Sequence, residues 1–121
     1  MKAIFRPSKM SGTVEAPPSK SLVHRYLIGA AISGQQCTLT GVDYSEDILA
    51  SIDCLRALGA NITLNQDEVV VNPDGFMKID SAILECRESG STLRFFIPLA
   101  LCLGKMVAFR GSERLLERPL E

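Results

Sequence analysis

Three glycines divide most of the chain into segments whose residue patterns alternate between two kinds. Gly34, Gly59 and Gly104 each follow a stretch in which apolar residues recur every three or four positions, the spacing of one helix face. Glycine commonly ends a helix because it takes up a left-handed backbone conformation without steric cost. Most of the stretches between these helices are short and bounded by turn residues, as strands are. The pattern predicts an α/β (α+β) fold.

The order of the predicted elements repeats once, incompletely. Residues 12–72 give strand–helix–strand–helix–strand–strand, and residues 80–121 begin the same order again. Because the second copy stops as a helix begins, at Pro119, we expect the chain to be a fragment of a longer protein. The predicted helices are 20–33, 46–58 (capped by Ser45) and 91–103, and the predicted strands are 2–6, 12–16, 36–40, 61–64, 68–72, 82–86 and 106–110. Helix 91–103 is apolar on nearly every side, which predicts that it is buried.

Charge and composition exclude several classes of function. The 13 basic and 14 acidic residues give a net charge of −1, which argues against general nucleic-acid binding and against a polybasic membrane surface. No apolar run is long enough to span a bilayer or resembles a signal peptide, so we expect a cytoplasmic protein. The single histidine and the absence of CxxC spacing argue against a zinc site. The cysteines are predicted to be buried free thiols: Cys37, Cys54, Cys86 and Cys102.

The first candidate site lies where two prolines, at positions 17 and 18, precede a predicted helix. Lys20 and Ser21 fall at the helix N-terminus, where free backbone N–H groups and the helix dipole favour an anion. Arg25 follows Ser21 by four residues and lies on the same helix face. An ammonium, a hydroxyl and a guanidinium together suit a phosphate or a carboxylate. The alternative is an ordinary capped helix with solvated charges.

A second candidate site occupies the equivalent position of the second copy. Gly90 allows the backbone to approach a ligand closely, and Arg94 falls on the first turn of the helix that follows. Arg118 precedes the helix expected at Pro119, although a solvated surface arginine is the simpler interpretation. Asp47, in the first turn of helix 46–58, is an ordinary favourable partner of the helix dipole.

Taken in order, these segments resemble the N-terminal part of the 5-enolpyruvylshikimate-3-phosphate synthase (EPSP synthase, or 3-phosphoshikimate 1-carboxyvinyltransferase) family. The resemblance covers essentially the whole chain and rests on residues 18–25, 45–60, 88–95 and 117–119. It implies βαβαββ folding units of an inside-out α/β barrel, with one complete unit at 12–72 and part of a second at 80–121. One position departs from the pattern, because Arg87 stands where glycine is commoner.

The resemblance also implies an activity. This family transfers the enolpyruvyl group of phosphoenolpyruvate to the 5-hydroxyl of shikimate 3-phosphate and releases phosphate, on the shikimate pathway to the aromatic amino acids. It uses no metal and no cofactor. Matched by motif, Lys20 would contact both substrates and take part in catalysis, and Ser21 and Arg25 would hold shikimate 3-phosphate. Gly90 and Arg118 would line the phosphoenolpyruvate pocket, where glyphosate also binds, whereas the roles of Asp47 and Arg94 are less defined.

Two alternatives remain open. One is the related enolpyruvyl transferase that acts on UDP-N-acetylglucosamine, against which Ser21 and Arg25 argue. The other is a non-catalytic anion-binding or assembly module. The resemblance implies a monomeric full-length enzyme whose main acid/base carboxylates lie outside these 121 residues. We therefore expect the fragment to be inactive and, through its uncovered apolar helix and sheet edge, to self-associate.

Overall fold

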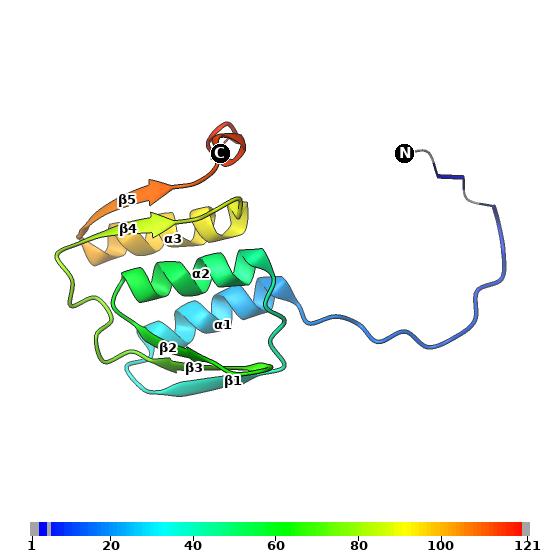
Figure 1. Ribbon diagram of the computed structural model, residues 1–121, viewed down its shortest axis with the longest axis horizontal. Coiled ribbons are helices and arrows are strands. Elements are labelled where there is room, and N and C mark those ends of the chain that lie inside the picture. Colours follow the sequence, from blue (N-terminus) through cyan, green and yellow to red (C-terminus); the bar gives the residue numbers. More distant parts are fainter. Residues whose placement is uncertain (1–2, 5, 120–121) are drawn as a thin grey trace.

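The computed structural model describes residues 3–4 and 6–119, which form a mixed α/β structure (Figure 1). Three predicted helices and five predicted strands are confirmed to within one residue at each end. No helix in this part of the chain has the length and apolar character needed to cross a membrane. The elements are α1 (Lys20–Ile32), β1 (Cys37–Thr40), α2 (Glu46–Ala57), β2 (Asn61–Leu64), β3 (Glu68–Asn72), β4 (Ser81–Glu85), α3 (Gly90–Leu103), β5 (Met106–Arg110) and α4 (Glu113–Leu116).

The first half of the structure is a three-stranded antiparallel sheet covered on one face by α1 and α2 (Figure 1). β3 is the central strand, and a hairpin through residues 65–67 joins it to β2. Alternate residues of β3 point to opposite faces, so Val69 and Val71 are fully buried while their neighbours are only partly covered. The period-two pattern of this strand therefore fixes which face meets the helices.

The second half is a parallel pair, β4 and β5, connected through α3. In Figure 1, α2 lies between this half and the three-stranded sheet, and it contacts both β2 and β4. It is accordingly buried on several sides, with Ile48, Ile52 and Leu55 fully enclosed. The core of the molecule is thus centred on α2.

The burial predicted for α3 is only partly correct. Leu93 and Phe96 are buried against the core, but Leu101 on the opposite side is 78% exposed. Within the described residues α3 packs against α2 and β5, and these cover one side of the helix. An apolar composition shows that a helix can be covered all round, but coverage requires neighbouring elements.

The two strands predicted before α1 are not present in the described structure. Residues 12–16 have no strand conformation, and Val14 is 90% exposed on a segment that runs away from the body of the molecule (Figure 1). For the predicted strand 2–6, residues 3–4 and 6 are not in a strand, and its other residues lie outside the described part. A strand needs a partner for its backbone groups, and this segment has none among the described elements.

Pro119 is not in a helix, and the residues that would continue the helix predicted to begin there lie outside the described part. A short helix, α4, precedes this proline instead, and the Ser112 side chain accepts a hydrogen bond from the Leu115 backbone N–H as its N-cap. Pro119 follows the C-cap residue Glu117 by two positions, a common place for proline after a helix. Ser45 does occupy the N-cap position of α2, but its side chain makes no capping hydrogen bond.

Two glycines allow the end of α2 to touch the turn that follows β3. Gly59 has φ +96°, and a Cβ atom built there would lie 2.2 Å from the backbone oxygen of Gly75. A Cβ at Gly75 would in turn lie 2.5 Å from the oxygen of Gly59. Neither contact is possible for a real side chain, so this crossing of two backbone segments depends on both glycines.

We expect Gly59→Ala to lower the free energy of unfolding by about 2–4 kcal/mol, because it adds a backbone clash to an unfavourable φ. Gly34→Ala is the matched control, since Gly34 has φ +72° but open space around its Cβ position. It should cost only about 1 kcal/mol. Urea denaturation followed by circular dichroism compares the two variants. Equal losses would show that the close approach to Gly75 is unimportant.

Candidate functional site

The N-termini of the three long helices lie at the same side of the molecule, on the right in Figure 1. Their first turns differ in charge. α2 begins with Glu46 and Asp47, whereas neither α1 nor α3 has an acidic residue in its first turn. The positive ends of the α1 and α3 dipoles are therefore not neutralised by their own helices.

The first cluster of predicted site residues lies on α1. Lys20 is the first helical residue, and the preceding Ser19 makes no side-chain capping bond. One turn later, Arg25 donates from Nη1 to the backbone oxygen of Ser21 at 2.7 Å and also contacts the Ser21 Oγ. Lys20, Ser21 and Arg25 are all exposed. They form a cationic group with a hydroxyl at an uncapped helix end, which suits an anion.

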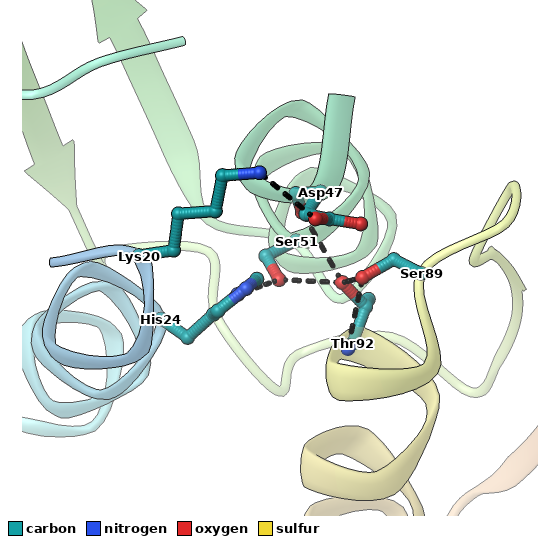
Figure 2. A network of polar contacts seen from close by, with 6 residues as sticks. All are labelled: Lys20, His24, Asp47, Ser51, Ser89 and Thr92. Atoms are coloured by element: carbon teal, nitrogen blue, oxygen red, sulfur yellow. Dashed lines mark hydrogen bonds and ion pairs between the residues drawn. The ribbon is translucent and has the colours of Figure 1, made fainter. Parts of the chain in front are cut away.

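Asp47 faces this cluster from α2. The Lys20 Nζ lies 3.4 Å from the Asp47 Oδ2, and both side chains remain partly open to solvent (Figure 2). Such an exposed pair contributes little to stability. Its effect is to hold the lysine ammonium over the space between the ends of α1 and α2.

The second cluster brings together Gly90, Arg94 and Arg118. A Cβ built at Gly90 would lie 3.4 Å from a guanidinium nitrogen of Arg118 and 3.8 Å from one of Arg94. Arg94 is held by a hydrogen bond from Nη2 to the Pro119 backbone oxygen at 3.2 Å. Two guanidinium groups thus flank the bare backbone at the start of α3.

A third set of contacts joins the two clusters. The Arg25 guanidinium lies over the Phe95 ring, 4.9 Å from its centroid, and the His24 ring is 5.8 Å from the same ring. Phe95 follows Arg94 on α3, so a cation–π contact ties the α1 cluster to the helix that carries the second cluster. All seven predicted site residues therefore lie on one side of the molecule.

Beneath the clusters lies a buried polar network that the sequence analysis missed (Figure 2). The His24 Nδ1 is 2.7 Å from the Ser51 Oγ, which is 2.9 Å from the Thr92 Oγ1. The Thr92 Oγ1 also lies 2.8 Å from the Ser89 Oγ and 3.2 Å from the Asp47 backbone oxygen. The one feature of the sequence that could have indicated this network is Ser51, a polar residue beside Ile52 in the apolar stripe of α2.

Burial lowers the pKa of His24 below its ordinary value of 6.5. The Asp47 carboxylate opposes this shift, while the positive charges of Lys20 and Arg25 add to it. The imidazole is only 2% exposed. A charged imidazolium would lack solvent there, so the folded protein favours the neutral form.

Arg87, which departs from the family pattern, has a structural role. Its φ is +53°, the left-handed conformation that glycine adopts freely. Its side chain contacts Glu46 and lies 2.7 Å from the Asp53 Oδ2, and hydrogen bonds to Asp53 and then Glu46 raise its pKa. Arg87 thus adopts a strained backbone conformation, and its side chain links α2 to the loop before α3.

The prediction of buried thiols is correct for two of the four cysteines. Cys54 and Cys86 are buried, whereas Cys37 is half-buried and Cys102 is exposed, and all four are free. Within the described residues, no group of three or more histidine, cysteine, aspartate or glutamate side chains is arranged to hold a metal ion.

A cavity of about 600 Å³ lies away from most of the charged residues, between α1 and β1. Leu22, Tyr26 and Leu39 contribute to its lining, which is mainly apolar, and Arg25 reaches its rim. Lys20, Gly90 and Arg118 do not line it. The cavity is therefore suited to apolar groups, and of the predicted site residues only Arg25 lines it.

The fold and these clusters define a mixed α/β protein with two adjoining cationic helix N-termini. The family model for EPSP synthase (3-phosphoshikimate 1-carboxyvinyltransferase) matches residues 4–121. The chain belongs to the EPSP synthase family.

Individual relatives agree with this assignment. The 3-phosphoshikimate 1-carboxyvinyltransferase of Clostridium perfringens (strain ATCC 13124) is 40% identical over 121 residues, 99% of this chain and 28% of the relative. That of Clostridium kluyveri is 42% identical over 116 residues, 96% of this chain and 27% of the relative. The solved EPSP synthase from Acinetobacter baumannii superposes with a TM-score of 0.69 at 26% identity, over 91% of this chain and 26% of that one. The chain thus spans little more than a quarter of the length of these relatives.

The lowered pKa of His24 predicts a pH dependence of stability. The unfolded chain binds a proton near pH 6.5 and the folded chain only at lower pH, so the free energy of unfolding should fall as pH drops from 7 through 6.5 to 5. His24→Asn provides the comparison, because its amide can replace the Nδ1 hydrogen bond but does not titrate. Urea denaturation at several pH values should give a shallower slope for this variant between pH 7 and 5. Equal slopes would contradict the prediction, whatever the difference in absolute stability.

Proposed function

We propose that this chain is the N-terminal substrate-binding part of a 3-phosphoshikimate 1-carboxyvinyltransferase. Such an enzyme transfers the enolpyruvyl group of phosphoenolpyruvate to the 5-hydroxyl of shikimate 3-phosphate, with release of phosphate, in the cytoplasm. The observation that carries the proposal is the pair of adjoining cationic helix N-termini on α1 and α3, in a chain that belongs to this family. Both substrates are polyanions, which such a site would attract. The division into a unit at 12–72 and part of another at 80–121 belongs to the same proposal.

The residue roles follow the two clusters. Ser21 and Arg25 would bind shikimate 3-phosphate, and Gly90 and Arg118 would bind phosphoenolpyruvate. This division is supported by the hydrogen bond between Arg25 and Ser21 and by the position of Arg118 at the bare backbone of Gly90. Lys20 lies at the exposed end of α1, where an ammonium can reach either ligand.

Asp47 and Arg94 would act on the substrate-binding groups of the two clusters rather than on the reacting atoms of the substrates. Asp47 would orient the Lys20 ammonium, to which it is paired. Arg94, fixed by its bond to the Pro119 carbonyl, would add a second positive charge beside Gly90. Both proposals rest on these two contacts.

The chemistry assigns a limited part to this chain. Addition to the enol ether carbon and the following elimination require a proton donor, a base and cationic groups that stabilise developing negative charge. Lys20, Arg25 and Arg118 can bind, orient and neutralise the anionic groups. The family resemblance assigns the main acid/base carboxylates to other parts of the enzyme, and it implies no metal or cofactor.

A non-catalytic anion-binding module is the second candidate, since it would need only the clusters described here. The UDP-N-acetylglucosamine transferase alternative fits less well, because the Ser21–Arg25 pair suits a compact phosphate. The family model and the relatives cited above all carry the name of the shikimate enzyme.

Anion binding tests the proposed site directly. We expect inorganic phosphate and shikimate 3-phosphate to shift the backbone amide signals of Lys20, Ser21 and Gly90 in an NMR titration. Lys20→Ala and Arg118→Ala should each weaken binding about tenfold, because a hydrogen bond to a charged group contributes roughly 1.5–3 kcal/mol.

Matched controls remove equally exposed charges outside the clusters. Lys105→Ala and Arg114→Ala should leave the affinity unchanged, since Lys105 follows α3 and Arg114 lies on α4, four residues before Arg118. If all four variants weakened binding equally, the effect would be one of net charge, and the proposed site would be wrong.

Turnover by the chain alone is not expected. With both substrates present, phosphate release should stay at the background rate, because the proposed clusters bind anions but cannot complete the proton transfers. Phosphate release that disappears in the Lys20→Ala variant would show that these residues suffice for catalysis.

We also propose that the chain alone self-associates, whereas the full-length enzyme is a monomer. Ile83, Leu101 and Met106 lie on β4, α3 and β5 and are 50%, 78% and 79% exposed, and apolar surface of this kind favours association. Light scattering should give a mass that rises with concentration, and Leu101→Lys should reduce that rise. A monomer at every concentration tested would contradict the proposal.

A further inference from the structure

Two hydrogen-bond directions in the buried network beneath the clusters follow from the contacts of Thr92. Each hydroxyl has a single hydrogen, and the Asp47 backbone oxygen can only accept one. The Thr92 hydroxyl must therefore donate to Asp47 if that 3.2 Å contact is a hydrogen bond. The same hydroxyl donates toward the Ser89 Oγ at 2.8 Å, so its single hydrogen is used and its oxygen accepts from the Ser51 hydroxyl at 2.9 Å.

This pattern fixes the form of the histidine. Because the Ser51 hydrogen is used toward Thr92, Ser51 must accept at the contact with the His24 Nδ1, 2.7 Å away. His24 therefore donates from Nδ1, and because burial favours the neutral imidazole, its single ring hydrogen lies on Nδ1. The hydroxyls of Ser51 and Thr92 each act as both donor and acceptor.

Each member of the network lies one turn or less from a residue of the proposed site. His24 follows Lys20 by four residues and adjoins Arg25, and Ser51 follows Asp47 by four. Thr92 follows Gly90 by two and receives support from Ser89, whose Oγ accepts a hydrogen bond from the Thr92 backbone N–H at 3.2 Å. Ser51 and Thr92 are completely buried, so they cannot bind a ligand themselves.

We propose that His24, Ser51 and Thr92 are positioning residues. They hold the first cluster, on α1, and the second cluster, at the start of α3, in the relative positions needed for anion binding. This role rests on the proposed function, and none of the three side chains is assigned a contact with substrate. The hydroxyl chain crosses α2 and links α1 to α3 in the dry interior, where a missing partner is costly. Solvent can compete for the contacts of Arg25 and Asp47 at the surface, but it cannot reach the hydroxyls.

Thr92→Val tests the role, because valine keeps the side-chain shape and removes only the hydroxyl. Thr92→Ser, which keeps the hydroxyl, is the matched rescue variant, and Thr38→Val on the exposed side of β1 is the remote control. Inorganic phosphate is the probe. Its affinity is measured by NMR at a temperature where circular dichroism shows every variant to be folded.

We expect Thr92→Val to bind phosphate about threefold to tenfold more weakly than the unmodified chain, and both control proteins to bind within about twofold of it. A purely structural role would lower the melting temperature without changing the affinity of the folded protein. A folded Thr92→Val with unchanged affinity would therefore overturn the positioning role alone. No phosphate response at Lys20 and Gly90 in the unmodified chain would overturn the proposed site together with this role.

The imidazole provides an independent signature. Nitrogen-15 spectra should show the hydrogen of His24 on Nδ1, and Ser51→Ala should change this tautomer because the acceptor is lost. A hydrogen on Nε2 in the unmodified chain would contradict the bonding pattern, and with it the proposed link, even if phosphate binds.

Discussion

The hydroxyl of Thr92 is the point on which the arrangement of the three long helices depends. It lies at the start of α3, contacts the backbone of α2 at Asp47 and reaches α1 through Ser51 and His24 (Figure 2). Apolar contacts along the helices tolerate small sliding movements, whereas hydrogen bonds of this kind tolerate little. The positions of the charged residues at the surface are therefore set by hydrogen bonds in the interior. The contacts between charged side chains at the surface can then be weak, because they do not have to hold the two clusters in place.

Much of this arrangement could be predicted from the sequence. Regular apolar spacing and terminal glycines located the helices, and the pairing of Arg25 with Ser21 followed from their separation of four residues. The grouping of Gly90 with Arg118 depended on family resemblance, because 28 positions separate them and no local rule joins them. In the structure, a guanidinium nitrogen of Arg118 lies 3.4 Å from the position that a Cβ atom of residue 90 would take.

The errors share one physical cause, which is that partners are not encoded locally. The segment 12–16 alternates as a strand does, but a strand forms only against another edge. α3 is apolar all round, yet Leu101 remains exposed because no described element covers it. Ser51 was not predicted to belong to a polar network because its partners are distant in the sequence. Its own helix gives no hint that a histidine and a threonine, 27 and 41 residues away, supply its bonds.

The contact between Gly59 and Gly75 has a consequence for motion. The connection from β3 to β4 runs from Pro73 to Asp80 and would be the natural place for a hinge between the two halves. Its backbone instead rests on the end of α2, where the Met77 N–H donates to the Leu58 carbonyl at 2.9 Å. A segment held at both its glycine crossing and this hydrogen bond cannot flex freely. The two halves, which carry the first and the second cluster, should therefore move together as one rigid body.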